Sequence, residues 1–208
     1  MSKGRLAIIG AGGNARELAE ICRGLDFEVA GFLIDGKPGQ FDSPNLGDFT
    51  WLEKNKVDGL VMGVGLPSAK LRLSQEVKMR FPSIQWPVIV DPSAYVGKNV
   101  DLDEGAVIGI RAVLTINISI GKFTQVNFAV SIGHETTIGN CCVINPGANV
   151  SGGVVIHDEV MIGSNATILQ YISVGAGAAV GAGAVVTKDV APRLQVVGIP
   201  AKPMPRSS

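Results

Sequence analysis

The chain has 208 residues, with 18 Lys and Arg against 18 Asp and Glu, and only 17% of its residues are charged. This balance argues against nucleic acid or a membrane surface as the main partner. Aromatic residues make up 5% whereas glycine occurs 27 times, a composition typical of a glycine-punctuated, aliphatic β architecture.

Residues 5–34 are predicted to form a strand, a glycine turn, a helix and a second strand. The turn, residues 10–15, has the pattern G-x-G-x-x-A. A third strand is expected at 60–64, a helix near 67–80 and a further apolar stretch at 87–90. This alternation predicts a small parallel sheet, and hence a Rossmann-like α/β domain over residues 1–86.

A glycine turn between a strand and a helix favours phosphate binding. Backbone N–H groups at Gly10, Gly12 and Gly13 could hold the phosphate, and Asp35 could accept a hydrogen bond from a ribose or a base. A nicotinamide dehydrogenase would use the same motif, but no second catalytic domain accompanies it here. A turn that serves only helix–strand packing is the remaining alternative.

From Val90 to Val186 an aliphatic residue recurs at every sixth position. All 17 of these positions, called the first place of each hexad, are Val, Ile or Leu. The fifth place is small or β-branched, and the second place is Gly in eight hexads. One hexad cannot bury its apolar side alone, so successive coils must stack. The pattern predicts a β-solenoid over residues 87–208, and a solenoid without catalysis is the plain alternative.

The chain is expected to be cytoplasmic and reduced. No stretch approaches the ~18 consecutive apolar residues of a membrane span, and the N-terminus does not have the pattern of a signal peptide. Cys22, Cys141 and Cys142 suit neither a disulfide framework nor a zinc site. We therefore expect neither a membrane nor a metal among its partners.

Taken together, the chain resembles the bacterial sugar O- and N-acyltransferases of the hexapeptide-repeat superfamily. This group includes nucleotide-4-amino-sugar N-acetyltransferases and sialic acid O-acetyltransferases. The resemblance rests on residues 10–13, 32–35, 127–135, 145–148 and 197–202. It implies a left-handed parallel β-helix after the Rossmann-like domain, with three hexads per triangular coil. It also implies acetyl-CoA as co-substrate and a homotrimer with each site between two subunits.

The resemblance also assigns catalytic residues. His134 matches the histidine that removes a proton from the acceptor, Glu135 matches the adjoining carboxylate, and Asn127 matches an asparagine near the acceptor. The chemistry is sensible, since imidazole titrates in the useful range and a carboxylate can orient it. His157 has no match, and two histidines argue against a β-helix carbonic anhydrase, which needs three zinc-binding histidines.

Two positions depart from the family pattern. Val143 stands where the family often has a second histidine, thought to contact the thioester, and Asn14 replaces a histidine in the glycine turn. How the thioester is bound, and which groups contact the nucleotide, therefore stay open.

With three hexads per coil, residues 18 apart form one column with a spacing of about 4.8 Å. His134, Gly152 and Lys188 share such a column, and its span of roughly 14 Å is comparable with a pantetheine arm. Gly152 would leave room for the arm, a lysine could bind a phosphate, and the small residues would form an adjacent column. The predicted CoA-binding residues are Gly152, Ser164, Ala182, Lys188 and Lys202.

The expected reaction is acetyl transfer from acetyl-CoA to the amine of a nucleotide-linked 4-amino sugar, a step of cell-surface polysaccharide biosynthesis. O-acetylation of a sialic acid or another sugar hydroxyl is one alternative. A non-catalytic nucleotide-sugar-binding scaffold is another. The nucleotide base, the sugar and the acyl chain length stay open at this point.

Overall fold

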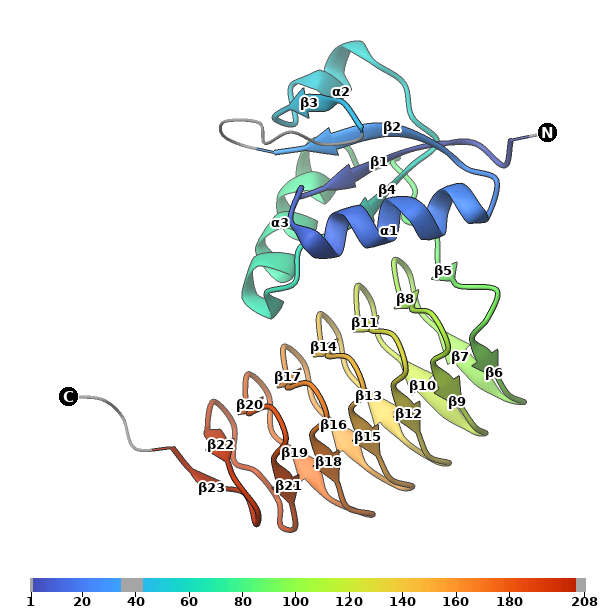
Figure 1. The fold of residues 1–208 in the computed structure, drawn as a ribbon. Helices are drawn as coiled ribbons and strands as arrows, with labels where there is room; N and C mark the ends of the chain where they lie inside the picture. The colour runs from blue at the N-terminus through green and yellow to red at the C-terminus, as the bar shows by residue number, and fades with distance from the viewer. Residues whose placement is uncertain (1, 35–42, 205–208) are drawn as a thin grey trace. The chain divides into compact units, whose positions relative to one another are not determined.

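A computed structural model describes residues 2–34 and 43–204 of the chain (Figure 1). The chain divides into two units, Met1–Ile89 and Val90–Ser208. They are called here the α/β unit and the β-helix unit, and each is described by itself.

The α/β unit is built on a parallel sheet of four strands in the order β3-β2-β1-β4. The strands are β1 (Arg5–Ile9), β2 (Glu28–Leu33), β3 (Asn45–Gly47) and β4 (Gly59–Met62). The helices are α1 (Gly13–Gly24), α2 (Trp51–Lys54) and α3 (Pro67–Arg80). The strands at 5–9, 28–33 and 59–62 and the helices α1 and α3 match the sequence-based prediction, whereas β3 and α2 were not predicted.

Burial explains why this sheet forms. The strands β1 and β4 are nearly continuous apolar runs, as expected for parallel strands buried on both faces. Gly63, directly after β4, allows α1 to approach closely: a Cβ added there would lie 2.7 Å from the Cβ of Ala15. Gly10, directly after β1, has φ of 95°, a conformation that glycine adopts without strain.

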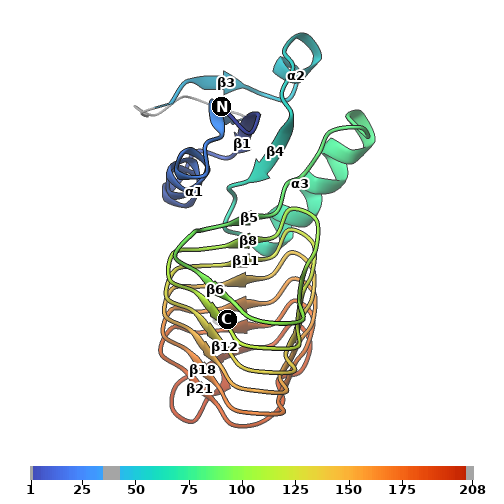
Figure 2. The same cartoon turned by 90° about the vertical axis from the view of Figure 1, so that its right-hand side faces the viewer.

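The β-helix unit consists of short strands, parallel except for the last, that form three sheets (Figure 2). One full coil takes 18 residues and has three faces, and each sheet runs along one of these faces. The eight-stranded sheet contains β5 (Ile89–Val90), β8 (Val107–Ile108), β11 (Gln125–Val126), β14 (Val143–Ile144), β17 (Met161–Ile162), β20 (Ala179–Val180), β22 (Gln195–Val197) and β23 (Lys202–Pro203). The six-stranded sheet contains β6 (Tyr95–Val96), β9 (Val113–Leu114), β12 (Ser131–Ile132), β15 (Asn149–Val150), β18 (Thr167–Ile168) and β21 (Val185–Val186). The five-stranded sheet contains β7 (Val100–Leu102), β10 (Ile118–Ile120), β13 (Thr137–Ile138), β16 (Val155–Ile156) and β19 (Ser173–Val174).

The first-place and fifth-place residues of the hexads form the hydrophobic core of this unit. First-place residues from Ile108 to Val186 are buried side by side with the small fifth-place residues. Val96 is 36% exposed, since the first coil has no coil before it. Strand partners lie 18 residues apart, as in the pairing of Ile120 with Ile138. The predicted triangular coil of three hexads is therefore confirmed.

The corners of the coil turn through residues with positive φ, which are the fourth-place residues of the hexads from 99 to 183 and, after the last hexad, residue 193. Glycine is the usual residue for this conformation, and asparagine tolerates it better than most. In this unit the positions are Asn99, Gly105, Arg111, Asn117, Phe123, Ala129, Glu135, Cys141, Gly147, Gly153, Glu159, Asn165, Tyr171, Gly177, Gly183 and Arg193. In the described part of the chain, no helix is long and apolar enough to cross a membrane.

Candidate active site

His134 lies in the turn that follows β12, at the corner between the six-stranded and five-stranded sheets. This corner, called the His134 corner, also carries Glu135, Gly152 and Lys188 one after another along the stack. The side chains of His134 and Glu135 are 54% and 59% exposed. This pair of side chains is therefore open to a ligand rather than enclosed within one chain.

The imidazole of His134 lies against the next coil, directly over Gly152. A Cβ added to Gly152 would lie 2.5 Å from both Cε1 and Nε2 of the ring. The space that this glycine leaves is thus taken by His134 itself. A Cβ added to the next residue, Gly153, would collide with the ring of Tyr171, which is 76% exposed. Two aromatic rings therefore lie over two consecutive glycines.

The carboxylate of Glu135 is bound on both oxygens. His134 Nδ1 is hydrogen-bonded to Oε2, and Asn117 Nδ2 donates to Oε1 at 3.3 Å. Asn99 Nδ2 in turn donates to Oδ1 of Asn117 at 2.9 Å. The chain of contacts Asn99–Asn117–Glu135–His134 follows the corner over three successive coils.

These contacts fix the proton of the imidazole. The hydrogen bond from His134, and then that from Asn117, hold the pKa of the Glu135 carboxyl below its ordinary value. An ionised carboxylate can only accept hydrogen bonds, so Nδ1 of His134 carries the proton and Nε2 keeps a lone pair. This arrangement can remove a proton from an acceptor and stabilise the imidazolium that forms.

The other predicted site residues of the β-helix lie at two different corners. Asn127, Ser164 and Ala182 lie in turns that precede strands of the six-stranded sheet, and these turns are called the Asn127 corner. Ser164 and Ala182 form a column of small residues at the corner next to that of Gly152. They differ from the His134 column by one third of a coil, so the whole face of the six-stranded sheet separates the two corners within a chain.

The amide of Asn127 takes part in the coil itself. Its Nδ2 donates to the carbonyl of Ile144 at 3.1 Å, and its Oδ1 accepts from Gln125 Nε2 at 2.9 Å. Asn145, one coil later, makes the same bond to Ile162 at 2.9 Å. The half-buried Asn127 is therefore held rigidly at the surface of its corner.

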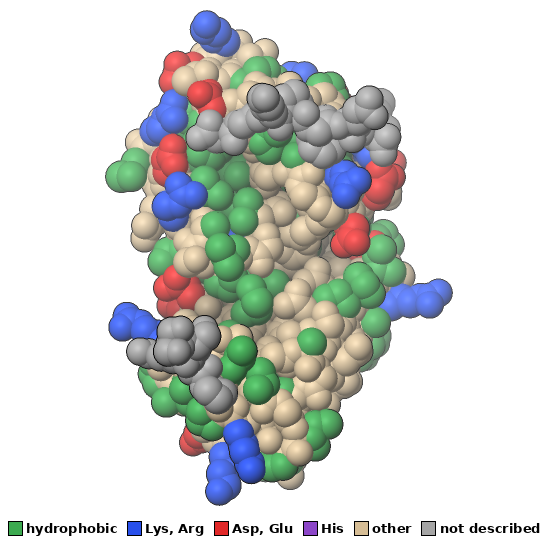
Figure 3. All heavy atoms as spheres, turned by 60° about the vertical axis from the view of Figure 1, so that its left-hand side comes forward, with side chains coloured by type: hydrophobic (Ala, Val, Ile, Leu, Met, Phe, Trp, Pro, Cys, Tyr) green, Lys and Arg blue, Asp and Glu red, His purple; other side chains and the backbone are tan. Residues whose placement is uncertain are grey.

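The two predicted phosphate-binding lysines also lie apart in the chain. Lys188 is exposed after β21 of the six-stranded sheet. Lys202 lies in β23, which pairs antiparallel with β22 at the end of the eight-stranded sheet. Figure 3 shows one face of the molecule, on which hydrophobic and uncharged atoms dominate and most lysine and arginine side chains lie toward the edges of the view.

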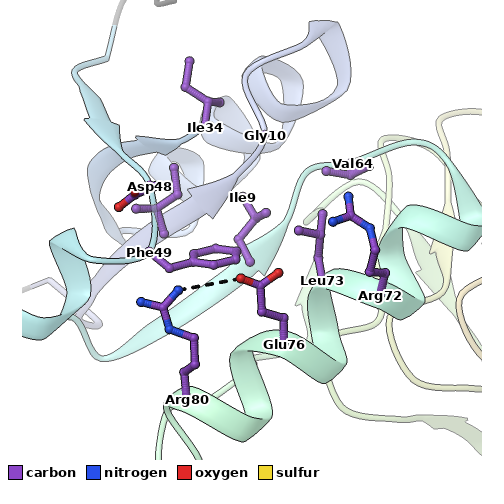
Figure 4. A pocket seen from close by; sticks show the side chains of 11 residues that line it. Ile9, Gly10, Ile34, Asp48, Phe49, Val64, Arg72, Leu73, Glu76 and Arg80 are labelled. Atoms are coloured by element: carbon purple, nitrogen blue, oxygen red, sulfur yellow. Dashed lines mark ion pairs between the residues drawn. The ribbon is translucent and has the colours of Figure 1, made fainter. Parts of the chain in front are cut away.

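The α/β unit contains a cavity of about 400 Å³ at the carboxyl ends of its central strands (Figure 4). Ile9 at the end of β1, Gly10 after it, Ile34 after β2 and Val64 after β4 form part of its wall. This edge of an open parallel sheet is where ligands usually bind. The remaining lining residues are Leu33, Asp48, Phe49, Arg72, Leu73, Glu76 and Arg80.

Charged side chains of both signs face this cavity. Arg80 on α3 pairs with Glu76 at 3.7 Å and with Glu53 at 3.1 Å. Arg72, two turns earlier on the same helix, is exposed at the other end of the cavity (Figure 4). Bonds from the hydroxyl and backbone N–H of Thr50 hold the pKa of Asp48 below its ordinary value.

The glycine turn meets the cavity only in part. Gly10 lines it, whereas Gly12 caps α1 and Gly13 begins the helix, and a Cβ added to either would meet no atom within 4 Å. Asn14 Nδ2 donates to the carbonyl of Gly63 at 2.9 Å and so ties the turn to the end of β4. Asp35 lies outside the described residues.

Comparison with known proteins relates the whole chain to acyltransferases. No protein-family model matches it. The UDP-3-O-acylglucosamine N-acyltransferase of Methylorubrum extorquens is 29% identical over 117 residues, 56% of this chain and 31% of that protein. The chain thus spans about a third of the length of the curated relatives matched first.

Two solved structures match almost from end to end. PerB of Caulobacter crescentus, crystallised with CoA and GDP-perosamine, is 26% identical with a TM-score of 0.91, over 98% of this chain and 99% of that one. The acetyltransferase domain of PglB from Neisseria gonorrhoeae is 28% identical with a TM-score of 0.77, over 96% and 99%.

The comparisons support the predicted resemblance to the bacterial sugar acyltransferases of the hexapeptide-repeat type. The predicted fold, an α/β domain followed by a left-handed parallel β-helix, is confirmed with it. The thiols of Cys142 and Cys22 have no nucleophilic setting. Burial raises the pKa of Cys142 to about 12, and its Sγ–H donates to the carbonyl of His157 at 3.0 Å. Burial also raises the pKa of Cys22 to about 12.

His157 lies at the third corner of the coil. It is exposed, and its Nε2 lies 3.3 Å from Oγ of Ser173. Among residues 2–34 and 43–204, no group of three or more His, Cys, Asp or Glu is placed to hold a metal ion.

Some residues at these sites were missed in the sequence. Arg72, Glu76 and Arg80 follow a four-residue spacing that places them on one face of the predicted helix. Asn99 and Asn117 precede Glu135 by 36 and 18 residues, so the coil period that located Gly152 would also have found them. Phe49 follows the unpredicted β3 and carried no signal.

Proposed function

We propose that this protein is an acetyl-CoA-dependent N-acetyltransferase that acts on the amine of a nucleotide-linked 4-amino sugar. The observation that carries the proposal is the His134–Glu135 pair, exposed on a β-helix whose end-to-end structural relatives include a protein crystallised with CoA and GDP-perosamine. Variants of that relative with a replaced histidine have been crystallised with the same two ligands.

In the proposed reaction Nε2 of His134 accepts a proton from the attacking amine, and Glu135 stabilises the imidazolium. The amine displaces CoA from the thioester through a tetrahedral intermediate, whose oxyanion is stabilised by backbone N–H groups. The proton on His134 then passes to the departing thiolate. Direct transfer needs no acyl-enzyme, which agrees with the raised pKa of Cys142.

The cavity of the α/β unit is the proposed site for the acceptor's nucleotide, so residues 1–86 serve as its binding domain. Gly10 lets the backbone approach the ligand, and Arg72 is placed to bind the diphosphate. Apolar side chains, among them Phe49, would cover the base. From the glycine pattern alone, we propose that the backbone N–H groups of Gly12 and Gly13 also contact the nucleotide. On the same ground, Asp35 is proposed to accept a hydrogen bond from its ribose or base.

We place the transferase site in residues 87–208 between copies of the chain, as a homotrimer. Four of the five residues proposed for acetyl-CoA fall on two corners of one chain: Gly152 and Lys188 on the His134 corner, Ser164 and Ala182 on the Asn127 corner, whereas Lys202 lies in β23. A neighbouring copy would bring its Asn127 corner against His134. Exposed apolar residues on and beside the six-stranded sheet suit such a contact; they are Tyr95, Val96, Ile110, Val113, Ile116 and Phe128.

O-acetylation of a sugar hydroxyl would use the same base. An ester product is lost in mild alkali whereas an amide survives, so product stability separates the two reactions.

The test is thiol release from acetyl-CoA with a panel of UDP-, GDP- and dTDP-4-amino sugars, for the wild type and His134→Ala. Release with one acceptor, reduced by about 10²- to 10⁴-fold in the variant, is expected from loss of a general base. Release that survives the substitution would remove His134 from this role. CoA binding without release from any acceptor would contradict the N-acetyl reaction, and absence of CoA binding would favour a scaffold.

A further inference from the structure

The Glu135 carboxylate is held by more than its histidine. One oxygen is hydrogen-bonded to His134 Nδ1, and the other accepts from Asn117 Nδ2 at 3.3 Å. A carboxylate bound at one oxygen only can rotate about its last bond. The second hydrogen bond opposes that rotation, so the plane of the carboxylate and its distance from the imidazole are both set.

Asn117 is itself oriented by the coil before it. Asn99 Nδ2 donates to Oδ1 of Asn117 at 2.9 Å, so the amide of Asn117 must present its nitrogen, and not its oxygen, to Glu135. An asparagine with the opposite orientation would place an acceptor against a carboxylate. The Glu135 carboxylate can only accept, so it requires this orientation of Asn117, and the hydrogen bond from Asn99 supports it.

The backbone makes this arrangement repeatable from coil to coil. Asn99, Asn117 and Glu135 have φ of 55°, 54° and 53°. Residues 18 apart with the same backbone conformation point their side chains in the same direction, one coil spacing apart. The three polar side chains can therefore form a continuous row that ends at His134.

We infer that Asn117 is a positioning residue of the transferase, which holds Glu135 in contact with His134 Nδ1 and is oriented for this by Asn99. The inference rests on the proposed function only for its effect on rate. Its effect on His134 is a property of the folded protein that can be measured without any substrate.

The charged and titratable groups around this row are few among the described residues. The coil before Glu135 presents Ile116 and Asn117, and the coil after it presents Gly152 and Gly153. The other titratable groups of the corner include Lys98, two coils before His134, the phenol of Tyr171 over Gly153, and Lys188, three coils after His134. None of them lies between Asn117 and Glu135, so a substitution at Asn117 acts on the pair itself.

The test uses two substitutions with opposite expected effects. Asn117→Gly removes the donor and suits the positive φ, so the turn is kept. The hydrogen bond between the Glu135 carboxylate and His134 Nδ1 is then formed for a smaller fraction of the time. Because this bond stabilises the imidazolium, the pKa of His134 is expected to fall. Asn117→Asp keeps the shape but adds a negative charge beside Glu135, so the pKa of His134 rises. Asn99→Gly is expected to give the smaller shift in the direction of Asn117→Gly.

The measurement is an NMR titration of histidine ring signals in the intact protein. The chain has two histidines, so His157 at another corner is an internal reference that should not move. Glu159→Gly is the matched control for the His134 signal, because it removes a carboxylate side chain at a positive-φ position of that other corner; His157 serves as the reference in the Asn99 and Asn117 variants only. A His134 pKa that is equal in the wild type and in both Asn117 variants would overturn the inference.

Kinetics of the same variants connect the inference to the proposed function. We expect kcat of Asn117→Gly to fall about 3- to 10-fold, as for loss of one hydrogen bond, with KM for acetyl-CoA unchanged. The two Asn117 variants could shift the pKa of His134 in opposite directions while the wild-type protein transfers no acetyl group. That outcome would support the positioning role of Asn117 and refute only the proposed reaction. Acetyl transfer that depends on His134 but is unchanged in kcat by Asn117→Gly would overturn the role of Asn117 and leave the reaction standing.

Discussion

His134 and Glu135 are consecutive residues whose side chains meet in a turn where Glu135 has φ of 53°. Non-glycine residues seldom adopt this conformation, and at a catalytic residue it suggests strain held for function. Here the same conformation recurs in almost every turn of the β-helix, at residues without any proposed role. The coil geometry therefore supplies the pairing of His134 with Glu135, and no special strain at the site is needed.

The charge of Glu135 can be tested apart from its shape by Glu135→Gln. Its pKa is lowered by the bonds from His134 and Asn117, so its stabilising effect is present at neutral pH and is lost only as the pH falls through that lowered pKa. The carboxylate is thus ionised throughout the range in which an imidazole titrates. We expect kcat to fall about 10- to 100-fold, as for a lost charged hydrogen bond.

The pH profile gives the sign of the effect. The carboxylate favours the imidazolium, so its removal lowers the pKa of His134, and the acid limb of kcat/KM moves to lower pH. An acid limb that stays in place in Glu135→Gln would show that this carboxylate does not act on the base.

Gly152 is expected to matter for His134 rather than for CoA. In Gly152→Ala the new methyl group would lie 2.5 Å from Cε1 and Nε2 of the imidazole, so the ring must leave its position. We expect a loss of kcat of about 10-fold or more, since small displacements of a catalytic group are costly. The affinity for CoA, measured by calorimetry, should change little, and a large loss of CoA affinity with kcat retained would contradict this. Ser151→Ala is the neighbouring control.

At the scale of the elements, each strand contributes one inward aliphatic residue to a core shared with the coils on either side. Ile168 in β18 is fully buried, whereas Thr167 beside it points outward and is half-buried. We expect Ile168→Ala to lower the free energy of unfolding by about 2–5 kcal/mol through the cavity it leaves. Thr167→Ala should change it by less than about 1 kcal/mol. Urea denaturation measures both, and equal effects would contradict the inward-outward alternation.

The strands of the β-helix were predictable because a strict six-residue period admits few structures. Which residues share a corner was harder to predict. Ser164 and Ala182 were expected in a column adjacent to that of Gly152, but the sequence did not show that the face of a whole sheet separates the two columns, because a step of six residues moves around the coil by one corner. Asn117 was overlooked for the same reason, because its relation to Glu135 exists only between coils. The short β3 and α2 have no period that a sequence pattern could reveal.

For the whole molecule, the separation of the proposed site into two corners has a functional consequence. One chain presents His134 and Gly152 at one edge of the six-stranded sheet and Ser164 and Ala182 at the other. A closed ring of copies would bring unlike edges together at each interface, so every interface would contain one complete site. Neither edge alone would bind acetyl-CoA and activate the acceptor.

Complementation between two inactive variants tests this arrangement. His134→Ala removes the base from one corner, and Ala182→Trp would obstruct the proposed path of CoA at the other. Each variant alone should form trimers without transferase activity. Trimers assembled from both chains at random would have both intact corners at about a quarter of their interfaces, and so about a quarter of the wild-type activity. The control is a mixture of the two variants after separate assembly, which should stay inactive. Because a site built within one chain would carry a defect in every copy, co-expressed variants without activity would show that the two corners do not meet across subunits.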